Sequence, residues 1–387
     1  MNNYKGKIKL FVSSLLLEIA LQSKKEISLK ELKECSINKR IFQHLNNYTK
    51  KVRNGNISIP YDFSRYQESQ INFSQSQVFA IEDSIIVSSP PIIIPQQGKY
   101  LIEHLDYNKV NKYNVAKSYS FQGIMSLVKS SPRKKTVINN KDVLLLDFMK
   151  ATTFFHWVMD GLTKVALFME LFPESKEFQV ICPISRLSWQ LESLEALGLS
   201  REQLLFVDQN PFFMERLWIA DYVRENPQFY PNDIVDILSK KIFKNVIANS
   251  TSIETPPLIY IKRKLASGRA IVNEQELIQS LKKFGFVDYY LEDMNFYKQV
   301  QLFYNAKVVI APHGAGLTNL IFSKSNTKIL ELFGDYLNPV FYKMSSAKGM
   351  DYFLFKGKDA DCKDSRRNNF YIDVSALESF LVRNDLI

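Results

Sequence analysis

Residues 308–322 read VVIAPHGAGLTNLIF, and this sequence predicts a strand, a tight turn and a helix in succession. A run of Val and Ile indicates a buried strand that ends at Pro312, and the two glycines of 313–316 allow close backbone approach before an apolar helix that opens at about Leu317. The N–H groups and the dipole at the start of such a helix bind phosphate or diphosphate. The stretch therefore predicts an anion site, with a purely structural strand–helix turn as the alternative.

Strands and helices alternate on both sides of this stretch, interrupted by a polar segment at 249–257. Such alternation is typical of parallel sheets covered by helices, which bind ligands at the carboxyl ends of their strands. We expect an α/β fold with two Rossmann-like domains, 76–250 and 251–387, that face each other across a cleft. We expect the first domain to bind an acceptor substrate and the second to bind a nucleotide. For residues 1–75 we expect a helical extension that precedes the two domains.

Composition excludes several classes of protein. With 387 residues and ~150 per domain, two sizeable domains are expected. A hydrophobic fraction of 46% and a charged fraction of 23% exclude a disordered chain and a small disulfide scaffold. The net charge of +10 favours phosphorylated or polyanionic partners. A nucleic-acid binder has only this charge in its favour, because no recognised binding module appears, so we expect no nucleic acid among the partners.

The cysteines and the first apolar segment bear on the compartment. Cys35, Cys182 and Cys362 are far apart and form no C-x-x-C pair, which indicates a reducing compartment and no zinc site. Residues 10–21 are apolar but too short for a bilayer, which needs ~20 residues, and contain Glu18. No signal-peptide cleavage site follows. We expect a cytoplasmic protein, with this segment either a buried helix or a peripheral contact on the inner face of the cytoplasmic membrane.

Polar and basic side chains surround the glycine turn. Thr318 and Asn319 fall in the first helical turn, where a hydroxyl and an amide can add hydrogen bonds, and His313 can donate to an anionic oxygen. Arg263 lies in the basic run 261–264 at the carboxyl end of the first strand of the second domain, and Arg269 follows five residues after this run, so that a guanidinium could pair bidentately with a phosphate. The alternative for the arginines is a solvated basic loop.

Glu331 lies in the strand ILELF that follows the glycine turn. An acidic residue at a strand end can accept from ribose hydroxyls, and a charge inside an apolar strand is costly without a partner. The candidate substrate-binding residues are therefore His313, Gly314, Ala315, Gly316, Leu317, Thr318, Asn319, Arg263, Arg269 and Glu331.

A second concentration of chemistry is the helix FFHWVMDGLTK at 154–164. His156, Asp160 and Thr163 fall at i, i+4 and i+7, in a narrow arc beside an apolar stripe. A carboxylate beside an imidazole can exchange a proton with a substrate hydroxyl. Asp160 is our candidate catalytic base, with His156 as the alternative base or its orienting partner. A pair that only stabilises the helix is the competing interpretation.

Taken together, these motifs resemble glycosyltransferase family 61, which includes bacterial capsule and surface-polysaccharide enzymes and plant and animal relatives. The resemblance runs from about residue 80 to the end, with the motifs in the same order. The family's H-G-A-G-L-T-N corresponds to 313–319, its F-H-W-x-x-D to 155–160, its E-L-F to 331–333, and its basic strand, Arg turn and N-E to 261–263, Arg269 and Asn273-Glu274.

The resemblance implies a GT-B type fold and an inverting glycosyltransferase of the EC 2.4 class. It further implies a nucleotide-sugar donor, UDP-linked in characterised relatives, with no required metal or other cofactor. The acceptor would be a hydroxyl of a cell-surface polysaccharide or glycolipid, presented as an oligosaccharide or a lipid-linked glycan.

Three other interpretations of the sequence concern a metal site, a different enzyme class and a protein without catalytic activity. Asp359-Ala360-Asp361 matches a D-x-D metal pattern, but it lies in a long polar segment that favours a solvated loop. A dinucleotide oxidoreductase would need a third glycine that the turn lacks. A non-catalytic protein of the same fold that binds nucleotide sugars or glycans is the main alternative to the enzyme.

Overall fold

The computed structural model of the chain forms two compact units, Met1–His44 with Ser74–Glu225 and Leu45–Phe73 with Asn226–Ile387. The residues that it describes are 39–43, 53–54, 75–87, 92–94, 136–138, 142–146, 152–182, 187–206, 212–220, 231–249, 255–264, 268–360 and 367–387. The expected helix at 10–21 lies outside them, as does most of the expected extension. The expected domain boundaries stay predictions.

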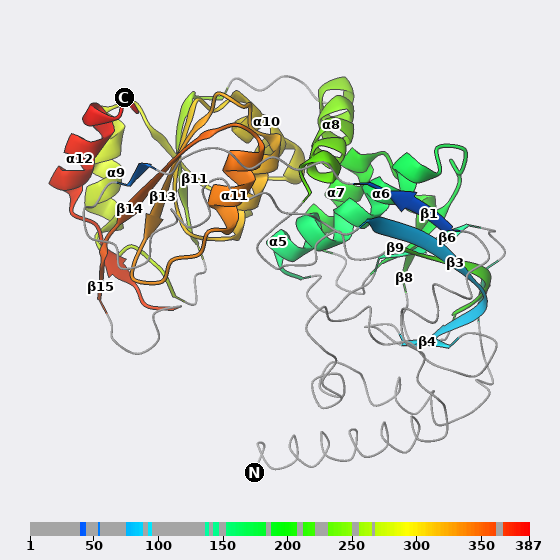
Figure 1. Cartoon of the computed structure of the whole chain (residues 1–387). Helices are drawn as coiled ribbons and strands as arrows, with labels where there is room; N and C mark the ends of the chain where they lie inside the picture. The colour runs from blue at the N-terminus through cyan, green and yellow to red at the C-terminus, as the bar shows by residue number, and fades with distance from the viewer. Residues whose placement is uncertain are drawn as a thin grey trace, which may run out of the picture. The chain divides into compact units, whose positions relative to one another are not determined.

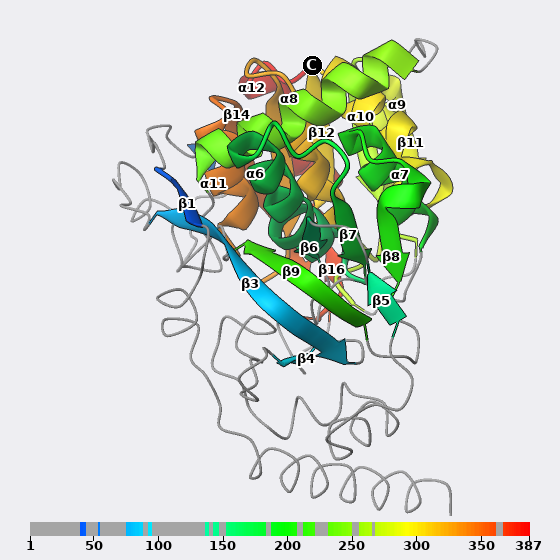
Figure 2. The same ribbon diagram turned by 90° about the vertical axis from the view of Figure 1, so that its right-hand side faces the viewer.

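The first unit contains an eight-stranded mixed sheet with the central order β1-β3-β9-β6-β7-β8. Its strands are β1 (Lys39–Phe42), β3 (Ser76–Val87), β4 (Ile92–Ile94), β5 (Thr136–Ile138), β6 (Val143–Leu145), β7 (Gln179–Cys182), β8 (Leu204–Phe206) and β9 (Phe212–Ala220). The parallel pairing of β6, β7 and β8 matches the expected alternation. β9 is parallel to β6 but antiparallel to the long β3 beside it (Figure 2). The sheet thus combines the parallel strands that the alternation predicts with an antiparallel part at β3 and β9.

One continuous helical stretch carries the motif at 154–164. It consists of α5 (Phe154–His156), the π-helical η3 (Trp157–Leu162) and α6 (Thr163–Leu171), and it is followed by α7 (Ser188–Leu197) and the short η4 (Arg201–Gln203). Of the expected apolar stripe, Val158, Met159, Leu162 and Val165 are buried and Phe155 is half-buried. Trp157 and Thr163 are buried as well, so burial extends around the helix. Trp157 donates from Nε1 to the Ser193 hydroxyl at 2.8 Å and so joins this stretch to α7.

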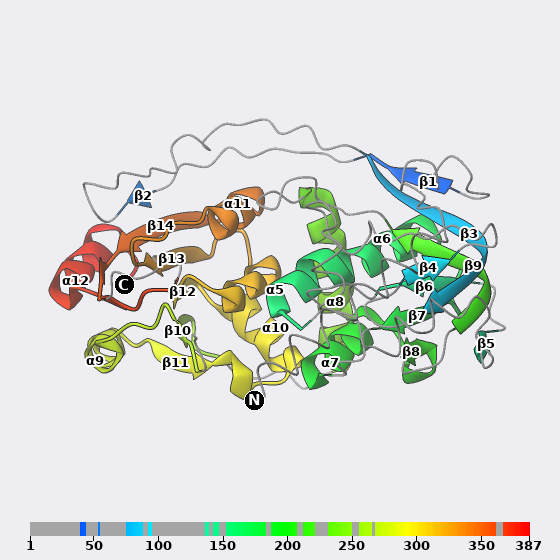
Figure 3. The same cartoon turned by 90° about the horizontal axis from the view of Figure 1, so that it is seen from below.

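The second unit contains a six-stranded sheet in which every pairing is parallel. Its strands, in spatial order, are β11 (Val287–Tyr290), β10 (Leu258–Lys262), β12 (Val308–Pro312), β13 (Lys328–Phe333), β14 (Asp351–Lys356) and β2 (Arg53–Asn54) (Figure 3). The first five follow a 2-1-3-4-5 order, which reverses between β10 and β12. Ligands of open α/β sheets bind beyond the carboxyl ends of the strands at this reversal. The α/β prediction is confirmed for this part of the chain.

Helices cover both faces of this sheet (Figure 1). On one face lie α9 (Glu274–Lys283) and α12 (Val374–Arg383), and on the other lie α10 (Phe296–Asn305), the 3₁₀ helix η6 (Ala315–Phe322) and α11 (Val340–Ala347). The helix α8 (Asn232–Asn249) packs on α10 and η6, and η5 (Leu291–Asp293) precedes α10. The side chains of Asn295 and Asp373 cap α10 and α12 by accepting from backbone N–H groups. Within the described part of the chain, no helix has the length and apolarity that crossing a membrane requires.

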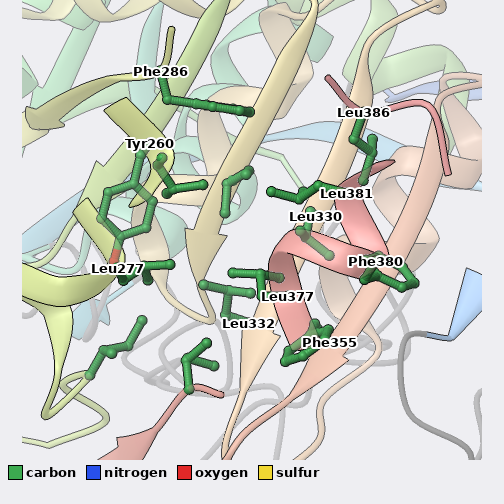
Figure 4. Close-up of a cluster of buried hydrophobic side chains, with 14 of the residues drawn as sticks. Tyr260, Leu277, Phe286, Leu330, Leu332, Phe355, Leu377, Phe380, Leu381 and Leu386 are labelled. Carbon is green, nitrogen blue, oxygen red and sulfur yellow. The ribbon is translucent and has the colours of Figure 1, made fainter. Parts of the chain in front are cut away.

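The core under α9 and α12 gives the sheet a rigid base (Figure 4). Leu277 and Leu377 from the two helices meet Leu330, Leu332 and Phe355 from the strands, and all five are buried. Full burial of a side chain of this size is worth ~1.5–3 kcal/mol. The loops at the carboxyl ends of β10, β12 and β13 are therefore held on a well-packed support.

The polar segment near residue 360 is more structured than we expected. β15 (Lys358–Asp359) and β16 (Phe370–Tyr371) pair antiparallel. The Asp359 carboxylate accepts from the Asp335 N–H at 2.8 Å and from Asn368 Nδ2 at 2.7 Å. Asp361 lies outside the described residues, and within them no cluster of three or more His, Cys, Asp or Glu could hold a metal ion. Asp359 thus fastens a loop to the end of β13.

Candidate active site

The carboxyl ends of β10 and β12 are joined by Arg263. Its Nη1 atom donates to the carbonyl oxygen of His313 at 2.6 Å. A Cβ atom on Gly314 would lie 3.1 Å from Nη1 and 3.4 Å from Cζ of the same guanidinium. Glycine at 314 therefore lets the charged group lie directly against the backbone of the turn. The basic residue and the glycine turn, which the sequence placed at neighbouring strand ends, are brought together by the structure.

Arg269 lies in a tight backbone turn. Its φ of 61° is in the left-handed region, where a side chain other than Gly or Asn is uncommon. A Cβ on the preceding Gly268 would lie 2.1 Å from the carbonyl oxygen of Arg367, and the Arg269 N–H donates to that same oxygen at 3.1 Å. The contacts of this turn thus hold Arg269 in an unfavourable conformation, as is often seen at functional sites.

The two half-buried arginines form a positive site. The pKa of Arg263 is lowered to about 10, chiefly by burial and also by the charge of Arg269, while Glu292 opposes the shift. Burial also lowers the pKa of Arg269, against the raising effects of Tyr336 and Glu331. Among the described residues no ion pair joins either guanidinium to a carboxylate. An anion between them would relieve both the desolvation and the mutual repulsion.

His313 is held from several sides. Its Nδ1 atom lies 2.5 Å from Glu331 Oε1, and its ring stacks on Phe333 with the centroids 5.1 Å apart. Only 7% of His313 and none of Glu331 is exposed. The other carboxylate oxygen of Glu331 accepts from the Tyr352 hydroxyl. The structure thus places Glu331 inside the protein with both oxygens bonded, and its contact with a ribose stays a prediction.

The turn itself presents backbone rather than side chains. Thr318 and Asn319 are both 0% exposed, and Leu317 is also buried. The Asn319 amide donates to Gln299 Oε1 at 3.0 Å and so fastens η6 to α10. Ala315 and Gly316 are half-buried, and no acceptor among the described residues bonds to their N–H groups. These two amides are the part of the motif that a ligand can reach without rearrangement.

Tyr336 belongs to this site and was missed by the sequence reasoning. It lies in the loop after β13, half-buried, with its ring 6.1 Å from the His313 ring in an edge-on arrangement. Its hydroxyl accepts from Asn338 Nδ2 at 3.1 Å. Its position just beyond the carboxyl end of a strand was the available signal.

The His156–Asp160 pair lies in the first unit. His156 Nδ1 is 2.6 Å from Asp160 Oδ2, so the contact expected from the i, i+4 spacing is confirmed. The side chain of Asp160 is 3% exposed and that of His156 is 18% exposed, which leaves the imidazole as the more accessible member. Asp160 sits in a π-helical turn, a rare form that is frequent at functional sites. Thr163 donates to the Met159 carbonyl inside the helix and takes no part in the pair.

Comparison with known proteins gives a family and several relatives. Residues 154–330 match the sequence profile of the family described as Glycosyltransferase 61. The EGF domain-specific O-linked N-acetylglucosamine transferase of Gallus gallus is 27% identical over 96 residues, which are 24% of this chain and 18% of that protein. Its counterpart from Canis lupus familiaris is 28% identical over 93 residues, 23% of this chain and 18% of that protein. The beta-1,2-xylosyltransferase RCN11 of Oryza sativa subsp. japonica is 30% identical over 105 residues, 24% of this chain and 20% of that protein.

The chain spans about a fifth of the length of these relatives. The matched range nevertheless contains the His156–Asp160 pair, both arginines and the whole glycine turn. The relatives are sugar transferases by name, which supports a transferase here. The resemblance drawn from the motifs is confirmed over residues 154–330, which match the glycosyltransferase 61 family.

Proposed function

We propose that this chain is an inverting glycosyltransferase that moves a sugar from a UDP-linked donor to a hydroxyl of a glycan acceptor without a metal. The observation that carries the proposal is the half-buried pair Arg263 and Arg269, of which Arg263 lies against the Gly314 backbone, without a carboxylate ion pair among the described residues. The family domain and the names of the relatives support sugar transfer.

The second unit holds the donor in this proposal. As the bond between the sugar and the diphosphate breaks, negative charge builds up on the leaving diphosphate. Without a metal, that charge needs fixed cations and oriented N–H groups in a site that is partly shielded from water. Arg263, Arg269 and the amides of Ala315 and Gly316 supply both at the start of η6.

The first unit supplies the base. The acceptor hydroxyl oxygen attacks the anomeric carbon, the carbon–oxygen bond to the diphosphate breaks, and the diphosphate leaves with the electron pair. The hydroxyl proton goes to Asp160, with His156, whose Nδ1 lies 2.6 Å from Asp160 Oδ2, as its orienting partner or as the alternative base. The proposal includes a GT-B arrangement that brings the two units to the same sugar.

A screen of nucleotide sugars tests this proposal. Each would be added to the protein in a thermal-unfolding assay, and the best would be incubated with candidate acceptors for product analysis. We expect a UDP-sugar to stabilise the protein and the product to have the inverted anomeric configuration. Arg263→Gln should strongly reduce the stabilisation, whereas the control Arg383→Gln, which removes an exposed guanidinium from α12, should keep it.

Three results would count against the proposal. Stabilisation of Arg263→Gln equal to that of the wild type would remove the donor assignment. Tight donor binding without turnover on any acceptor would favour the alternative, a non-catalytic binder of nucleotide sugars or glycans. Retention of the donor's anomeric configuration in the product would contradict direct displacement.

We also propose the biological setting expected from the sequence. The acceptor is a surface polysaccharide or a lipid-linked glycan, as in bacterial capsule synthesis, and the chain works in the cytoplasm with contact to the inner membrane face. The net charge of +10 supports this contact. Cosedimentation with anionic vesicles, absent with neutral ones, would test it.

A further inference from the structure

Three neighbouring strands contribute a continuous chain of buried polar side chains. His313 follows β12, Glu331 lies in β13 and Tyr352 lies in β14. The register pairs Ala311 with Glu331 and Ile329 with Tyr352, which sets the three side chains close together across the sheet. His313 Nδ1 is 2.5 Å from Glu331 Oε1, and the Tyr352 hydroxyl bonds to Glu331 Oε2.

The direction of these hydrogen bonds follows from the chemistry of the groups. Burial and the adjacent Glu331 raise the pKa of Tyr352 well above its usual value, so its hydroxyl keeps its proton and donates. A carboxylate that accepts from the tyrosine also accepts from the imidazole, which places a proton on His313 Nδ1. Nε2 is then the remaining ring nitrogen, and it has no hydrogen bond to any described residue.

The same histidine is tied to the arginine site. Its N–H donates to the Leu332 carbonyl at 2.9 Å, and its own carbonyl accepts from Arg263. Its ring is packed against Phe333 and Phe341, which restricts rotation. A histidine fixed in this way presents one nitrogen in one direction, as in sites where a carboxylate behind an imidazole selects its tautomer.

We propose that Glu331 and Tyr352 are positioning residues of the donor site: they hold the proton on His313 Nδ1 and direct Nε2 toward the bound nucleotide diphosphate. The identity of this ligand rests on the function proposed above. The tautomer of His313 does not depend on that function, and it can be measured without any ligand.

The chain offers a matched control in the same unit. Tyr260 is also buried, in β10, and donates to the Glu274 carboxylate at 2.8 Å. Burial and Glu274 raise its pKa in the same way as for Tyr352. Tyr260→Phe and Tyr352→Phe each remove one buried hydroxyl–carboxylate hydrogen bond, but only Tyr352→Phe affects the support of His313.

The first experiment is NMR of the imidazole nitrogens in ¹⁵N-labelled full-length protein, which has 4 histidines. His313→Gln assigns the His313 signals. We expect a protonated Nδ1 in the wild type and in Tyr260→Phe, and changed His313 shifts in Tyr352→Phe and Glu331→Gln. A wild-type His313 with its proton on Nε2 and a bare Nδ1 would overturn the proposal, even if the variants fail to fold.

The second experiment is calorimetric titration with UDP. We expect a loss of affinity of about 10- to 100-fold for Glu331→Gln and a smaller loss for Tyr352→Phe, by analogy with outer-shell partners of histidine ligands. Tyr260→Phe should bind as the wild type does. Equal UDP affinity in Tyr352→Phe and Tyr260→Phe would overturn the positioning role while leaving the transferase in place. Failure of the wild type to bind any nucleotide would instead remove the proposed function, with the tautomer result unaffected.

Discussion

The glycine at 314 provides the sharpest single perturbation of the donor site. In Gly314→Ala, the new Cβ would lie 3.1 Å from Arg263 Nη1, 3.4 Å from Cζ and 3.7 Å from Nε. The φ of 174° at this position is extended backbone that alanine adopts readily. The contact is therefore relieved by a shift of a few tenths of an ångström or more in the guanidinium rather than in the backbone.

Gly314→Ala should affect stability and nucleotide binding to different extents. Alanine lowers the entropy of the unfolded chain, which favours the folded protein by ~0.4–1 kcal/mol and offsets the strain of the contact, so we expect nearly unchanged stability. A hydrogen bond to a charged group is worth ~1.5–3 kcal/mol, so misplacing Arg263 should weaken nucleotide binding by about 10- to 150-fold. Gly314→Ala should therefore lower the affinity for UDP without lowering the stability of the fold.

The assay is calorimetric titration with UDP, together with thermal unfolding, on Gly314→Ala, Arg263→Gln and the double variant. If the alanine acts through Arg263, it should cost little more affinity in the Arg263→Gln background. Wild-type affinity in Gly314→Ala would refute the reasoning, and so would an equal loss in both backgrounds.

Three further predictions follow from the same geometry. Asp160→Asn should abolish sugar transfer while leaving the Kd for UDP nearly unchanged, and a normal turnover rate would exclude both assignments of the base. The pKa of Arg263 is about 10 and a bound anion raises it, so UDP affinity should be complete below pH 10 and fall as the pH rises through that value. In Arg263→Gln this fall should be absent, and any pH dependence that remains comes from the titration of UDP itself. Asp359→Ala should lower the free energy of unfolding by ~1–3 kcal/mol, measured by chemical denaturation, because it removes two hydrogen bonds that hold a loop. Turnover of the wild type should stay complete in excess chelator.

Local signals in the sequence predicted the elements of the second unit well. The apolar runs on either side of the glycine turn are strands at 308–312 and 328–333, as their sequence indicated. The His156–Asp160 contact depends only on spacing along one helix, so it was predictable as well. β9 was missed because Glu215 and Arg216 interrupt its apolar pattern.

The arrangement of the donor site depends on contacts between distant segments. The bonding of Glu331 to both His313 and Tyr352 follows from the register of three strands, which no local pattern specifies. Likewise, Asn319 is buried because η6 packs on α10, where Gln299 accepts from its amide. The motif predicted a site at the carboxyl ends of the strands, but it did not tell which of its side chains are buried and bonded to one another, as Glu331 and Asn319 are.

The most direct test of the central claim is a crystal structure of the chain with UDP bound. The diphosphate should lie between the guanidinium groups of Arg263 and Arg269, within hydrogen-bond distance of the Ala315 and Gly316 amides. Clear density for UDP at any other place, with both arginines unoccupied, would contradict it.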